Sequence, residues 1–297
     1  MSKSKTSPVD FQNAYSSLNP AQKQAVDAID GPVMVIAGPG TGKTQILATR
    51  IANILEKTDT DPGAILALTF TDSGSTAMRQ RLLSLIGPNA YRVNVNTFHS
   101  FTSSLIQEFP DHFIYSENAL PLTDLERFEI LGNILNQNSF ELLKPINSPH
   151  YYLYTQNAIP SSLQTLKREG VTPEKLKLLL DQEFHELEND KDTLSKTDFE
   201  KRNKDLLKNL DLLKIYVAYQ KELKDRSRYD FDDMINWVLQ ELKNPNSELL
   251  SILQERFHYF LVDEYQDTNS AQNEIIDLLV SYWGDKANLF VVGDDEQ

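Results

Sequence analysis

The residues VMVIAGPGTGKTQILATRIANIL, numbers 33–55, are the part of the sequence most specific for one type of fold. It opens with an apolar run typical of a buried parallel strand and closes with a helix-like segment. Between them lies AGPGTGKT, residues 37–44, in the strand-to-helix context that a phosphate-binding loop requires. Glycines in such a loop let successive backbone N–H groups point at phosphate oxygens, and the helix N-terminus adds partial positive charge. The stretch therefore predicts a P-loop domain built on a parallel sheet.

The loop supplies the first candidate ligands for ATP and Mg²⁺. We expect Lys43 to reach the β and γ phosphates and Thr44 to hold Mg²⁺ through its hydroxyl. The strict pattern has glycine at the position of Ala37, a small replacement that we expect to leave the turn intact. The alternative is a glycine-rich turn without a ligand. The predicted nucleotide-binding residues of the loop are Gly38, Pro39, Gly40, Thr41, Gly42, Lys43 and Thr44.

Further apolar runs of strand length follow along the chain. They are VMVIA (33–37), ILALTF (65–70), residues 93–95, YFLV (259–262) and LFVV (289–292). Helix-like stretches separate most of them, and this alternation predicts an α/β domain with a parallel sheet and crossover helices.

The strand signals stop between about residue 108 and residue 227, where the pattern turns helical. We expect helices at 124–136, 173–188 and 197–226, the last with Leu206, Leu210, Leu213 and Val217 on one face. The prediction is an all-helical domain, 108–227, inserted into an α/β domain formed by 1–107 and 228–297. A single continuous α/β domain would need strands that this stretch does not show.

The second half of the expected site is YFLVDEYQDTN, residues 259–269. Asp263 directly follows the apolar run and is placed to meet the Mg²⁺ held by Thr44. Glu264 is placed to orient or deprotonate the water that attacks the γ-phosphate. Two acids after a strand can also simply solvate a loop, but a P-loop in the same chain favours the catalytic interpretation.

Composition limits the class of protein without naming a partner. The chain has 29 basic and 43 acidic side chains, a net charge of −14, and residues 228–297 hold 15 of the acids against 4 basic groups. A nucleic-acid partner would favour the opposite sign, although a divalent cation or a basic neighbour can offset a local excess. There is no cysteine, signal peptide or bilayer-spanning run, so we expect a cytoplasmic protein without a membrane partner.

Seven segments together carry a family resemblance. In chain order they are LNPAQKQAV (18–26), AGPGTGKT (37–44), LTFTDSGSTAMRQRL (68–82), NTFHSF (96–101), YDFDDMI (229–235), LVDEYQDTNSAQ (261–272) and VVGDDEQ (291–297). The chain resembles the UvrD/Rep/PcrA type of superfamily 1 DNA helicase, a family used in DNA repair and related processes. The resemblance implies a RecA-like domain (1A) with an inserted 1B domain, and ATP and Mg²⁺ as cofactors. It also implies movement 3′ to 5′ along single-stranded DNA, with unwinding of 3′-tailed duplex DNA.

The resemblance assigns further nucleotide contacts. Gln22 matches the family's adenine-recognising glutamine, and Gln297 matches a glutamine near the γ-phosphate that couples nucleotide state to DNA grip. Gln266 and Asp267 would support that coupling. Gln45 stands where several members carry an arginine that packs on adenine, so it belongs to the expected nucleotide site with weaker stacking.

The same resemblance assigns contacts with single-stranded DNA. Phe70 and Asp72 match two such positions, and Thr97 and His99 match two more. Phe70 is either a base-stacking platform or a core aromatic at a strand end. Family members usually show TFTNKAA where this chain has TFTDSGS, so Asp72 and Ser73 replace an asparagine and a lysine. An added acid and a lost lysine both weaken phosphate binding.

Hydrolysis needs a group that compensates the charge spreading over the γ-phosphoryl oxygens, usually an arginine worth about 10³ to 10⁵ in rate. No motif of the chain supplies one. In the resembled family it comes from a second, downstream RecA-like domain. We therefore expect the chain, which stops at NLFVVGDDEQ, to be the N-terminal half of a motor that binds Mg-ATP weakly and turns it over hardly at all.

Two other functions remain open on the sequence. The chain can be the motor part of an AddA- or RecB-type helicase and nuclease, or an ATP-dependent DNA-binding switch that does not unwind. The tyrosine-rich segment PHYYLYTQNAIP, residues 149–160, is either an aromatic core cluster or a surface for stacking bases. No lysine or arginine lies between its tyrosines, which favours the core.

Overall fold

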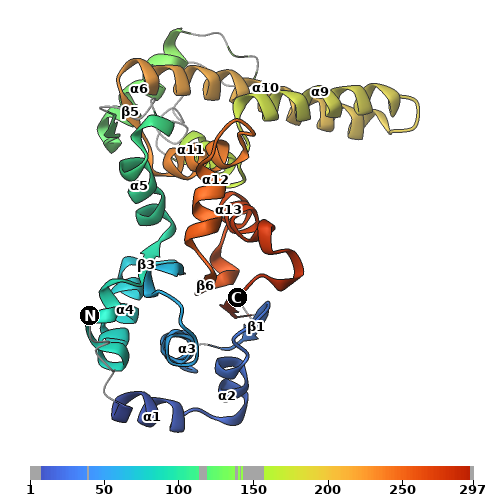
Figure 1. Ribbon diagram of the computed structural model, residues 1–297. Coiled ribbons are helices and arrows are strands. Elements are labelled where there is room, and N and C mark those ends of the chain that lie inside the picture. Colours follow the sequence, from blue (N-terminus) through green and yellow to red (C-terminus); the bar gives the residue numbers. More distant parts are fainter. Residues whose placement is uncertain are drawn as a thin grey trace. The chain divides into compact units, whose positions relative to one another are not determined.

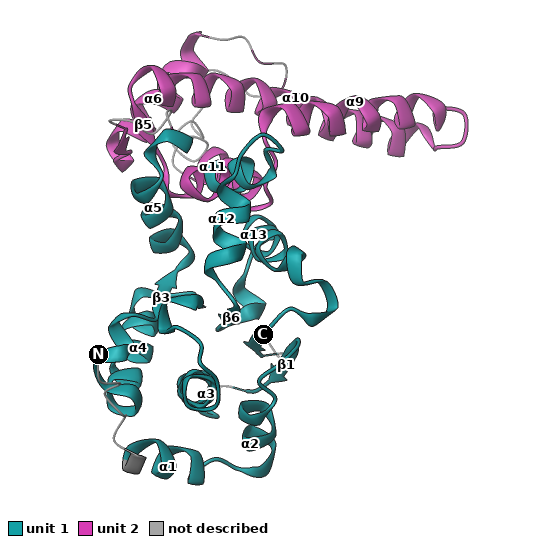
Figure 2. Cartoon of the chain, viewed as in Figure 1, with its two compact units in different colours: residues 1–112, 237–297 teal, residues 113–236 magenta. Residues whose placement is uncertain are grey.

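The computed structural model describes residues 8–38, 40–113, 119–137, 140, 142 and 157–294. The chain forms two compact units (Figure 2). Unit 1 comprises residues 1–112 and 237–297, and unit 2 comprises residues 113–236. The sequence-based division at 107/108 and 227/228 stays a prediction. None of the described helices has the length and apolar content needed to cross a membrane.

Unit 1 is an α/β unit, as the sequence predicts (Figure 1). Its strands are β1 (Val33–Ile36), β2 (Ile65–Thr69), β3 (Asn94–Thr97), β6 (Tyr259–Val262) and β7 (Leu289–Gly293). Its helices are α1 (Pro8–Ser16), α2 (Pro20–Asp27), α3 (Lys43–Lys57), α4 (Asp72–Ile86), α5 (Phe98–Glu108), α12 (Leu249–Arg256) and α13 (Ser270–Val280). Short 3₁₀ helices are η1 (Pro62–Ala64), η2 (Gly87–Tyr91), η3 (Pro110–His112), η6 (Tyr265–Asp267) and η7 (Ser281–Lys286).

The strands form one parallel sheet in the order β1-β7-β6-β2-β3. The side chains of β2 alternate between two faces, because successive residues of a strand point to opposite sides. Ile65 and Ala67 pack in one core cluster with residues of α3 and α4, while Leu66 and Leu68 are buried outside that cluster. Burial on both faces explains why β2 reads as an unbroken apolar run.

Strand β1 corrects one expectation. The apolar run VMVIA predicts a strand buried on both faces, but Met34 and Ile36 are 66% and 64% exposed. Val33 and Val35 pack against the core on the other face. The reason is topological, since β1 lies at the edge of the sheet with β7 as its neighbour. The apolar run VMVIA does not by itself indicate whether its strand lies at the centre or at the edge of the sheet.

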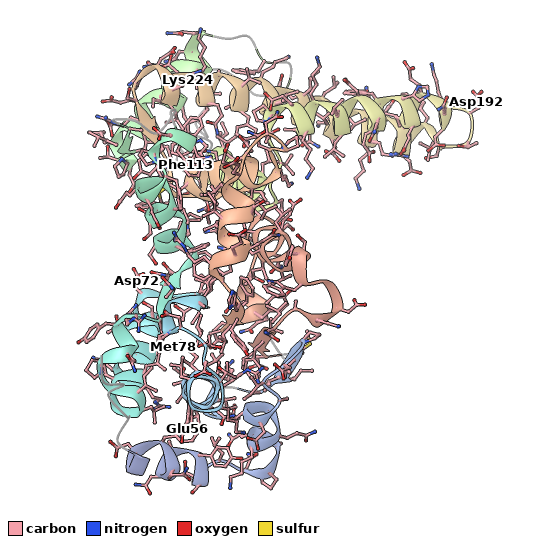
Figure 3. All side chains as sticks on the ribbon, viewed as in Figure 1. Glu56, Asp72, Met78, Phe113, Asp192 and Lys224 are labelled. Atoms are coloured by element: carbon pink, nitrogen blue, oxygen red, sulfur yellow. The ribbon has the colours of Figure 1, made fainter. Side chains whose placement is uncertain are left out.

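The described residues of unit 2 form helices apart from one short strand pair. It contains α6 (Asp124–Gln137), α8 (Ile159–Arg168), α9 (Pro173–Asn189), α10 (Lys196–Asp225) and the start of α11 (Phe231–Lys243). The strands β4 (Leu120–Pro121) and β5 (Arg228–Tyr229) form a parallel pair. The all-helical prediction for 108–227 is therefore wrong at 120–121, where a two-residue strand is too short to give an apolar run in the sequence. The helices α9 and α10 run side by side over much of their length, and Figure 3 labels Asp192 in the turn that joins them.

The residues of α10 that are buried in the core of unit 2 match the predicted apolar face only in part. Leu206 and Leu213 are buried, but Val217 is 52% exposed, and Tyr216 and Tyr219 are buried instead. The first half of α10 lies against α9, whereas its later residues approach α6 and β5. The buried face therefore changes along the helix, which a single repeat does not reveal. The tyrosine-rich segment at 149–156 lies outside the described residues.

Candidate nucleotide site and nucleic-acid edge

The predicted phosphate loop joins β1 to α3. Gly40 and Gly42 have φ angles of 75° and 86°, in the left-handed region that favours glycine. A Cβ atom built on Gly40 would meet no atom within 4 Å, so backbone conformation rather than space requires glycine there. Gly42 is the N-cap of α3, which begins at Lys43. Of the predicted loop residues, Pro39 lies outside the described part of the chain.

The loop is closed by hydrogen bonds of its own. The Thr41 hydroxyl donates to the carbonyl oxygen of Gly38 at 2.7 Å, and the Gln45 backbone N–H donates to the carbonyl of Gly42 at 2.8 Å. The side chain of Gln22, in α2, donates from Nε2 to the Thr41 carbonyl at 3.0 Å. A hydrogen bond thus joins Gln22, the candidate for adenine recognition, to the candidate phosphate-binding loop.

Lys43 and Glu264 meet across the site. Lys43 Nζ lies 2.7 Å from Glu264 Oε2, and the two side chains are 10% and 37% exposed. Burial by itself would raise the pKa of Glu264, but the hydrogen bonds from Lys43 and Gln266 outweigh it and lower the pKa. Glu264 has φ 50° and ψ 49°, a left-handed conformation that costs a residue with a Cβ about 1–2 kcal/mol. The fold holds this carboxylate in place against backbone preference.

Asp263 directly follows β6 and precedes Glu264. Its side chain is buried, and its Oδ1 accepts a hydrogen bond from the backbone N–H of Glu264 at 3.0 Å. Burial, and then the charge of Glu264, raise the pKa of Asp263 to about 6. Thr44 is half-buried at the start of α3. A hydroxyl and a carboxylate are hard oxygen ligands of the kind that Mg²⁺ takes, so Thr44 and Asp263 fit the predicted ion in chemistry.

Gln266 connects the ends of two strands. Its Nε2 donates to Glu264 Oε2 at 2.8 Å, and its Oε1 accepts from the backbone N–H of Asp294 at 3.0 Å. A Cβ atom on Gly293 would lie 3.0 Å from Gln266 Oε1, so glycine ends β7 there. The carboxylate of Glu264 is therefore tied to the strand that leads toward Gln297, which itself lies outside the described residues. Asp267 follows in η6, with Oδ2 at 3.4 Å from Gln266 Nε2.

Gln45 also has specific partners. Its Nε2 donates to the Ser17 hydroxyl at 3.1 Å, and its Oε1 accepts from Arg81 Nη1 at 3.3 Å. Arg81 belongs to α4, far along the sequence, so no local motif could have identified it. The Arg81 guanidinium is thus hydrogen-bonded to Gln45, which stands where several members of the resembled family carry an arginine.

Four predicted DNA contacts lie at or just after the ends of β2 and β3. Phe70 is 51% exposed, which removes the core interpretation of its ring. Asp72 is exposed in the first turn of α4 (Figure 3). Thr97 is buried, and its Oγ1 caps α5 by accepting from the Ser100 backbone N–H at 3.1 Å. His99 is half-buried in the first turn of α5. Thr97 therefore has a structural role whether or not it meets DNA.

The register of the sheet brings both sets of residues to one edge. Thr69 pairs with Thr97, Leu68 with Val262, and Ile36 with Gly293. Because all the strands are parallel, their carboxyl ends open on the same edge. The phosphate loop, the two acids after β6 and the residues after β2 and β3 all leave the sheet there. Ligands of open parallel sheets bind at this edge as a rule.

Sequence reasoning missed Arg50, whose hydrogen bonds hold the helix that carries Gln22. This fully buried arginine of α3 donates to the carbonyl oxygens of Ala25 at 2.7 Å and Ile29 at 3.0 Å. Its guanidinium lies 4.3 Å from the centre of the Phe290 ring, and burial lowers the pKa of Arg50 to about 10. Arg50 thereby joins the helix that carries Gln22 to α3 and β7. The signal was present as a single charge inside the apolar run ILATRIANIL.

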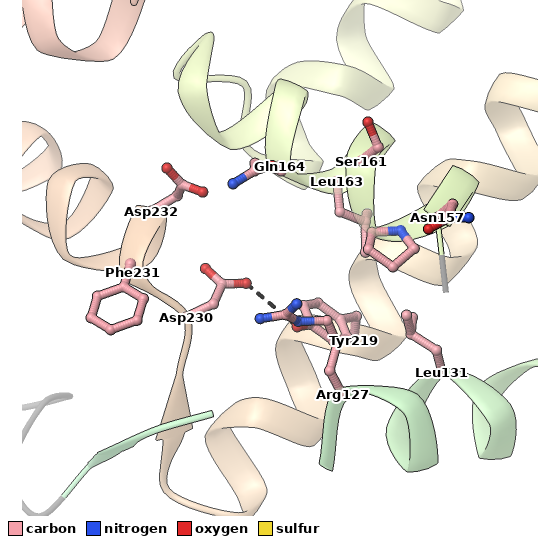
Figure 4. A pocket seen from close by; sticks show the side chains of 11 residues that line it. Arg127, Leu131, Asn157, Ser161, Leu163, Gln164, Tyr219, Asp230, Phe231 and Asp232 are labelled. Carbon is pink, nitrogen blue, oxygen red and sulfur yellow. Dashed lines mark hydrogen bonds between the residues drawn. The ribbon is translucent and has the colours of Figure 1, made fainter. Parts of the chain in front are cut away.

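Unit 2 holds a second cluster of charges, which sequence reasoning also missed. Lys167 is buried, with Nζ 2.7 Å from Asp230 Oδ2 and 2.6 Å from Asp233 Oδ1. Burial by itself would lower the pKa of Lys167, but the two carboxylates raise it above its ordinary value. Asp230 also borders a cavity of about 440 Å³ whose wall includes Arg127, and Figure 4 shows its hydrogen bond with Tyr219.

The family model described as the UvrD/REP helicase N-terminal domain matches residues 18–297. The chain belongs to this family. The match spans residues of both units and all seven motif segments, and it agrees with the α/β sheet and phosphate loop of unit 1.

Curated relatives carry matching names. The ATP-dependent DNA helicase PcrA of Bacillus subtilis is 29% identical over 282 residues, covering 95% of this chain and 33% of the relative. A probable DNA helicase II homolog of Rickettsia conorii is 33% identical over 293 residues, covering 96% of this chain and 38% of the relative. DNA helicase II of Rickettsia typhi is also 33% identical, over 290 residues. The chain thus spans between a third and two fifths of the length of these relatives.

Proposed function

We propose that this chain is the N-terminal motor part of an ATP-dependent DNA helicase that moves 3′ to 5′ along single-stranded DNA. The observation that carries the proposal is the contact between Lys43 of the phosphate loop and Glu264 after β6, with Asp263 beside it. Membership of the UvrD/REP family and the helicase names of the relatives support it. Single-stranded and 3′-tailed duplex DNA are the proposed substrates.

The residues of the site can divide the work of ATP hydrolysis. On binding, Lys43 would exchange Glu264 for the β and γ phosphates, and backbone N–H groups of the loop would surround the same phosphates. Glu264 would then be free to orient the attacking water and accept its proton. After Lys43 has left, the hydrogen bond from Gln266 Nε2 still favours the ionised form of Glu264. Thr44 and Asp263 would hold Mg²⁺, which when bound neutralises charge on the phosphate oxygens.

Coupling to DNA follows from the shared edge. Phe70 and His99 would contact bases or backbone of one strand at the ends of β2 and β3. Gln266 would transmit movement at the end of β7 to Glu264, since it is bonded to both. These links give a route by which nucleotide state changes the grip on DNA.

A second RecA-like domain is part of the proposal. Among the described residues Glu264 is bonded to Lys43 and Gln266, and no arginine contacts either acid of the pair after β6. The arginine that stabilises the transition state would come from the second domain. We propose that this chain by itself binds Mg-ATP weakly and hydrolyses it at a rate that single-stranded DNA hardly changes.

The test measures ATP binding by equilibrium dialysis and phosphate release with and without an oligonucleotide, using this chain. Weak, Mg²⁺-dependent binding with little turnover is the expected result. Absence of any ATP binding would overturn the nucleotide site, and robust DNA-stimulated turnover would overturn the need for a second domain. Strand displacement on a 3′-tailed duplex, by a protein carrying this chain with a second RecA-like domain, separates a helicase from a DNA-binding switch. Nuclease assay of the same protein tests the AddA- or RecB-type alternative.

A further inference from the structure

Unit 2 contains a cavity of about 440 Å³ that has no part in the nucleotide site proposed above. Its wall includes residues of α6, α8, α10 and α11. Leu131, Leu163 and the ring of Tyr219 give the wall apolar surface, and Asp230 and Gln164 give it polar surface (Figure 4). A cavity of this size that combines apolar walls with a few polar groups is typical of a site for a small molecule.

One carboxylate oxygen of the wall lacks a hydrogen bond. Lys167 Nζ lies 2.7 Å from Asp230 Oδ2 and 2.6 Å from Asp233 Oδ1. Asp233 Oδ2 accepts from the Asp230 backbone N–H at 3.0 Å, so both oxygens of Asp233 are satisfied. Asp230 Oδ1, in contrast, is buried and has no hydrogen-bond partner among the residues that the structure describes. A buried acceptor without a donor is unfavourable, so a ligand that brings a donor to it gains binding energy.

The same cluster carries more negative than positive charge. Lys167 is shared by Asp230 and Asp233, so one cation serves two carboxylates. Burial raises the pKa of Asp230 to about 6, although the charge of Lys167 opposes this shift. At neutral pH the Asp230 side chain is therefore still mostly ionised, and a buried carboxylate is stabilised by a further cation.

The other charged groups of the wall have partners of opposite sign. Arg127 Nη1 lies 3.1 Å from Asp124 Oδ1, and Asp232 Oδ1 lies 3.5 Å from Arg168 Nε. These two pairs add no net charge to the wall. The oxygen and the excess charge of Asp230 therefore determine the kind of ligand, which needs a positive charge and an N–H donor.

An ammonium group on a short alkyl chain meets both requirements. It is a compact cation with N–H donors and no acceptor. Because Asp230 Oδ1 lies deep in the wall, this compact group suits it better than a broad, planar guanidinium. The side-chain amide oxygen of Gln164 can accept a second N–H, and the alkyl chain would lie against Leu131 and Leu163.

We propose that this cavity binds a small alkylammonium cation, with an N–H of the cation donating to Asp230 Oδ1. Free amines and lysine side chains carry the same group. The site is independent of the proposed nucleotide site, because each of the described lining residues belongs to unit 2.

The first experiment tests the chemistry of the ligand. Dissociation constants are measured by NMR titration of the unmodified chain at constant ionic strength. The probe is n-butylammonium, and the controls are tetramethylammonium, which has the charge without an N–H, and butan-1-ol, which has the alkyl chain without the charge. We expect the probe to bind roughly tenfold more tightly than either control, the worth of a hydrogen bond to a charged group. Equal binding of the two cations would overturn the hydrogen bond to Asp230, and no binding of the probe would overturn the site.

Two further probes distinguish the sources of the ammonium group. They are butane-1,4-diammonium and a lysine blocked at both backbone ends. Tighter binding of the diammonium supports a free amine as the ligand, and tighter binding of the blocked lysine supports a protein side chain.

A second experiment uses variants to locate the probe. Asp230→Asn should weaken binding of n-butylammonium roughly 10- to 100-fold, and circular dichroism melting checks that the variant is folded. If it is not, Gln164→Trp fills the cavity from an exposed position of α8, and Thr165→Trp places the same ring on the next residue, which is exposed outside the wall. We expect binding to be lost in Gln164→Trp alone. Equal affinities of these two tryptophan variants would overturn the cavity as the site.

The sign of the ligand charge is tested at Arg127. Replacing this residue by methionine removes a positive charge from the wall, so Arg127→Met should bind n-butylammonium roughly two- to fivefold more tightly. Weaker binding in Arg127→Met would show that the wall does not select a cation.

Discussion

Two lysines of this chain carry the same charge in opposite settings. Lys43, in unit 1, has one carboxylate partner, Glu264, whose side chain is 37% exposed. Lys167, in unit 2, is 1% exposed and lies between Asp230 and Asp233, which are 17% and 5% exposed. The first lysine can leave its partner for a phosphate at low cost. The second cannot leave without stranding two carboxylates in the interior.

The comparison shows how a lysine that awaits a ligand differs from one that holds a fold. Around Lys43 the contacts are few and come from a half-open site, so an anion can replace them. Around Lys167 they join α8 to the β5–α11 segment, and Asn236 adds a bond from Nδ2 to the Lys167 carbonyl at 2.9 Å. Burial and the number of partners, rather than the presence of an ion pair, distinguish the two roles.

The largest expected effect comes from Lys167→Met. Removing the lysine leaves Asp230 and Asp233 without their cation, and we expect the free energy of unfolding of unit 2 to fall by about 3–5 kcal/mol. Urea denaturation followed by circular dichroism measures it. Lys208→Met is the matched control, because Lys208 pairs with Asp205 at the surface of the same unit and should change stability little. Similar losses in the two variants would show that burial does not make Lys167 more important for stability than a surface lysine.

Lys43→Met should weaken nucleotide binding and leave stability nearly unchanged, unlike Lys167→Met, whose main effect is on stability. We expect Mg-ATP binding to weaken roughly 10- to 100-fold, since a charge-assisted contact with the phosphates is lost, while the free energy of unfolding changes by less than about 1 kcal/mol. Lys57→Met, at the other end of α3 and paired with Asp27, is the control that should leave nucleotide binding unchanged. A folding defect as large as that of Lys167→Met would show that Lys43 is structural.

Asp263→Asn tests the contribution of a buried acid of the nucleotide site to stability. The folded-state pKa of Asp263, about 6, lies above its ordinary value of 3.8, so its ionised form opposes folding above that pKa. We expect the variant to be more stable than the parent at pH 7 by roughly 1–3 kcal/mol. The difference should shrink as the pH falls from 6 to 3.8, because the folded parent takes up a proton in this range, and below 3.8 the unfolded parent is protonated as well. Mg-ATP binding should weaken, and a stability gain that persists unchanged at pH 4 would contradict the assignment.

Asp72→Asn should have the smallest effect. Asp72 is exposed at the start of α4, so its charge acts on a nearby phosphate only through water. We expect single-stranded DNA to bind about two- to fivefold more tightly at low salt, measured by fluorescence anisotropy over a salt series. Glu56→Gln, near the end of α3, removes a charge far from that edge and should change nothing (Figure 3). Equal gains in both variants would point to net charge alone.

Much of the fold was predictable from the sequence because the chemistry is local. The run YFLV at 259–262 is β6, and the helices expected at 124–136 and 173–188 are α6 and α9 to within one residue at their ends. The phosphate loop was predictable since glycine is needed where φ is positive, at Gly40 and Gly42. Such signals need no knowledge of distant contacts.

What the sequence could not provide depends on residues far apart in the chain. Lys167 and Asp233 form an ion pair although they lie 66 residues apart in the chain, and no sequence motif predicts that pairing. Arg81 reaches Gln45 from another helix. The exposure of Met34 follows from the order of strands, which the apolar run does not contain. Contacts of this kind depend on the topology of the fold, whereas a sequence motif predicts only contacts among its own residues.

The left-handed backbone of Glu264 bears on how this protein would change under selection. A library screened for heat resistance alone should accept glycine at this position, because glycine relieves the unfavourable φ angle and removes a partly buried acid. The same substitution removes the proposed catalytic carboxylate. Thermal selection and selection for ATP turnover should therefore choose different residues at position 264, and a library screened both ways would show which of the two demands the natural glutamate serves.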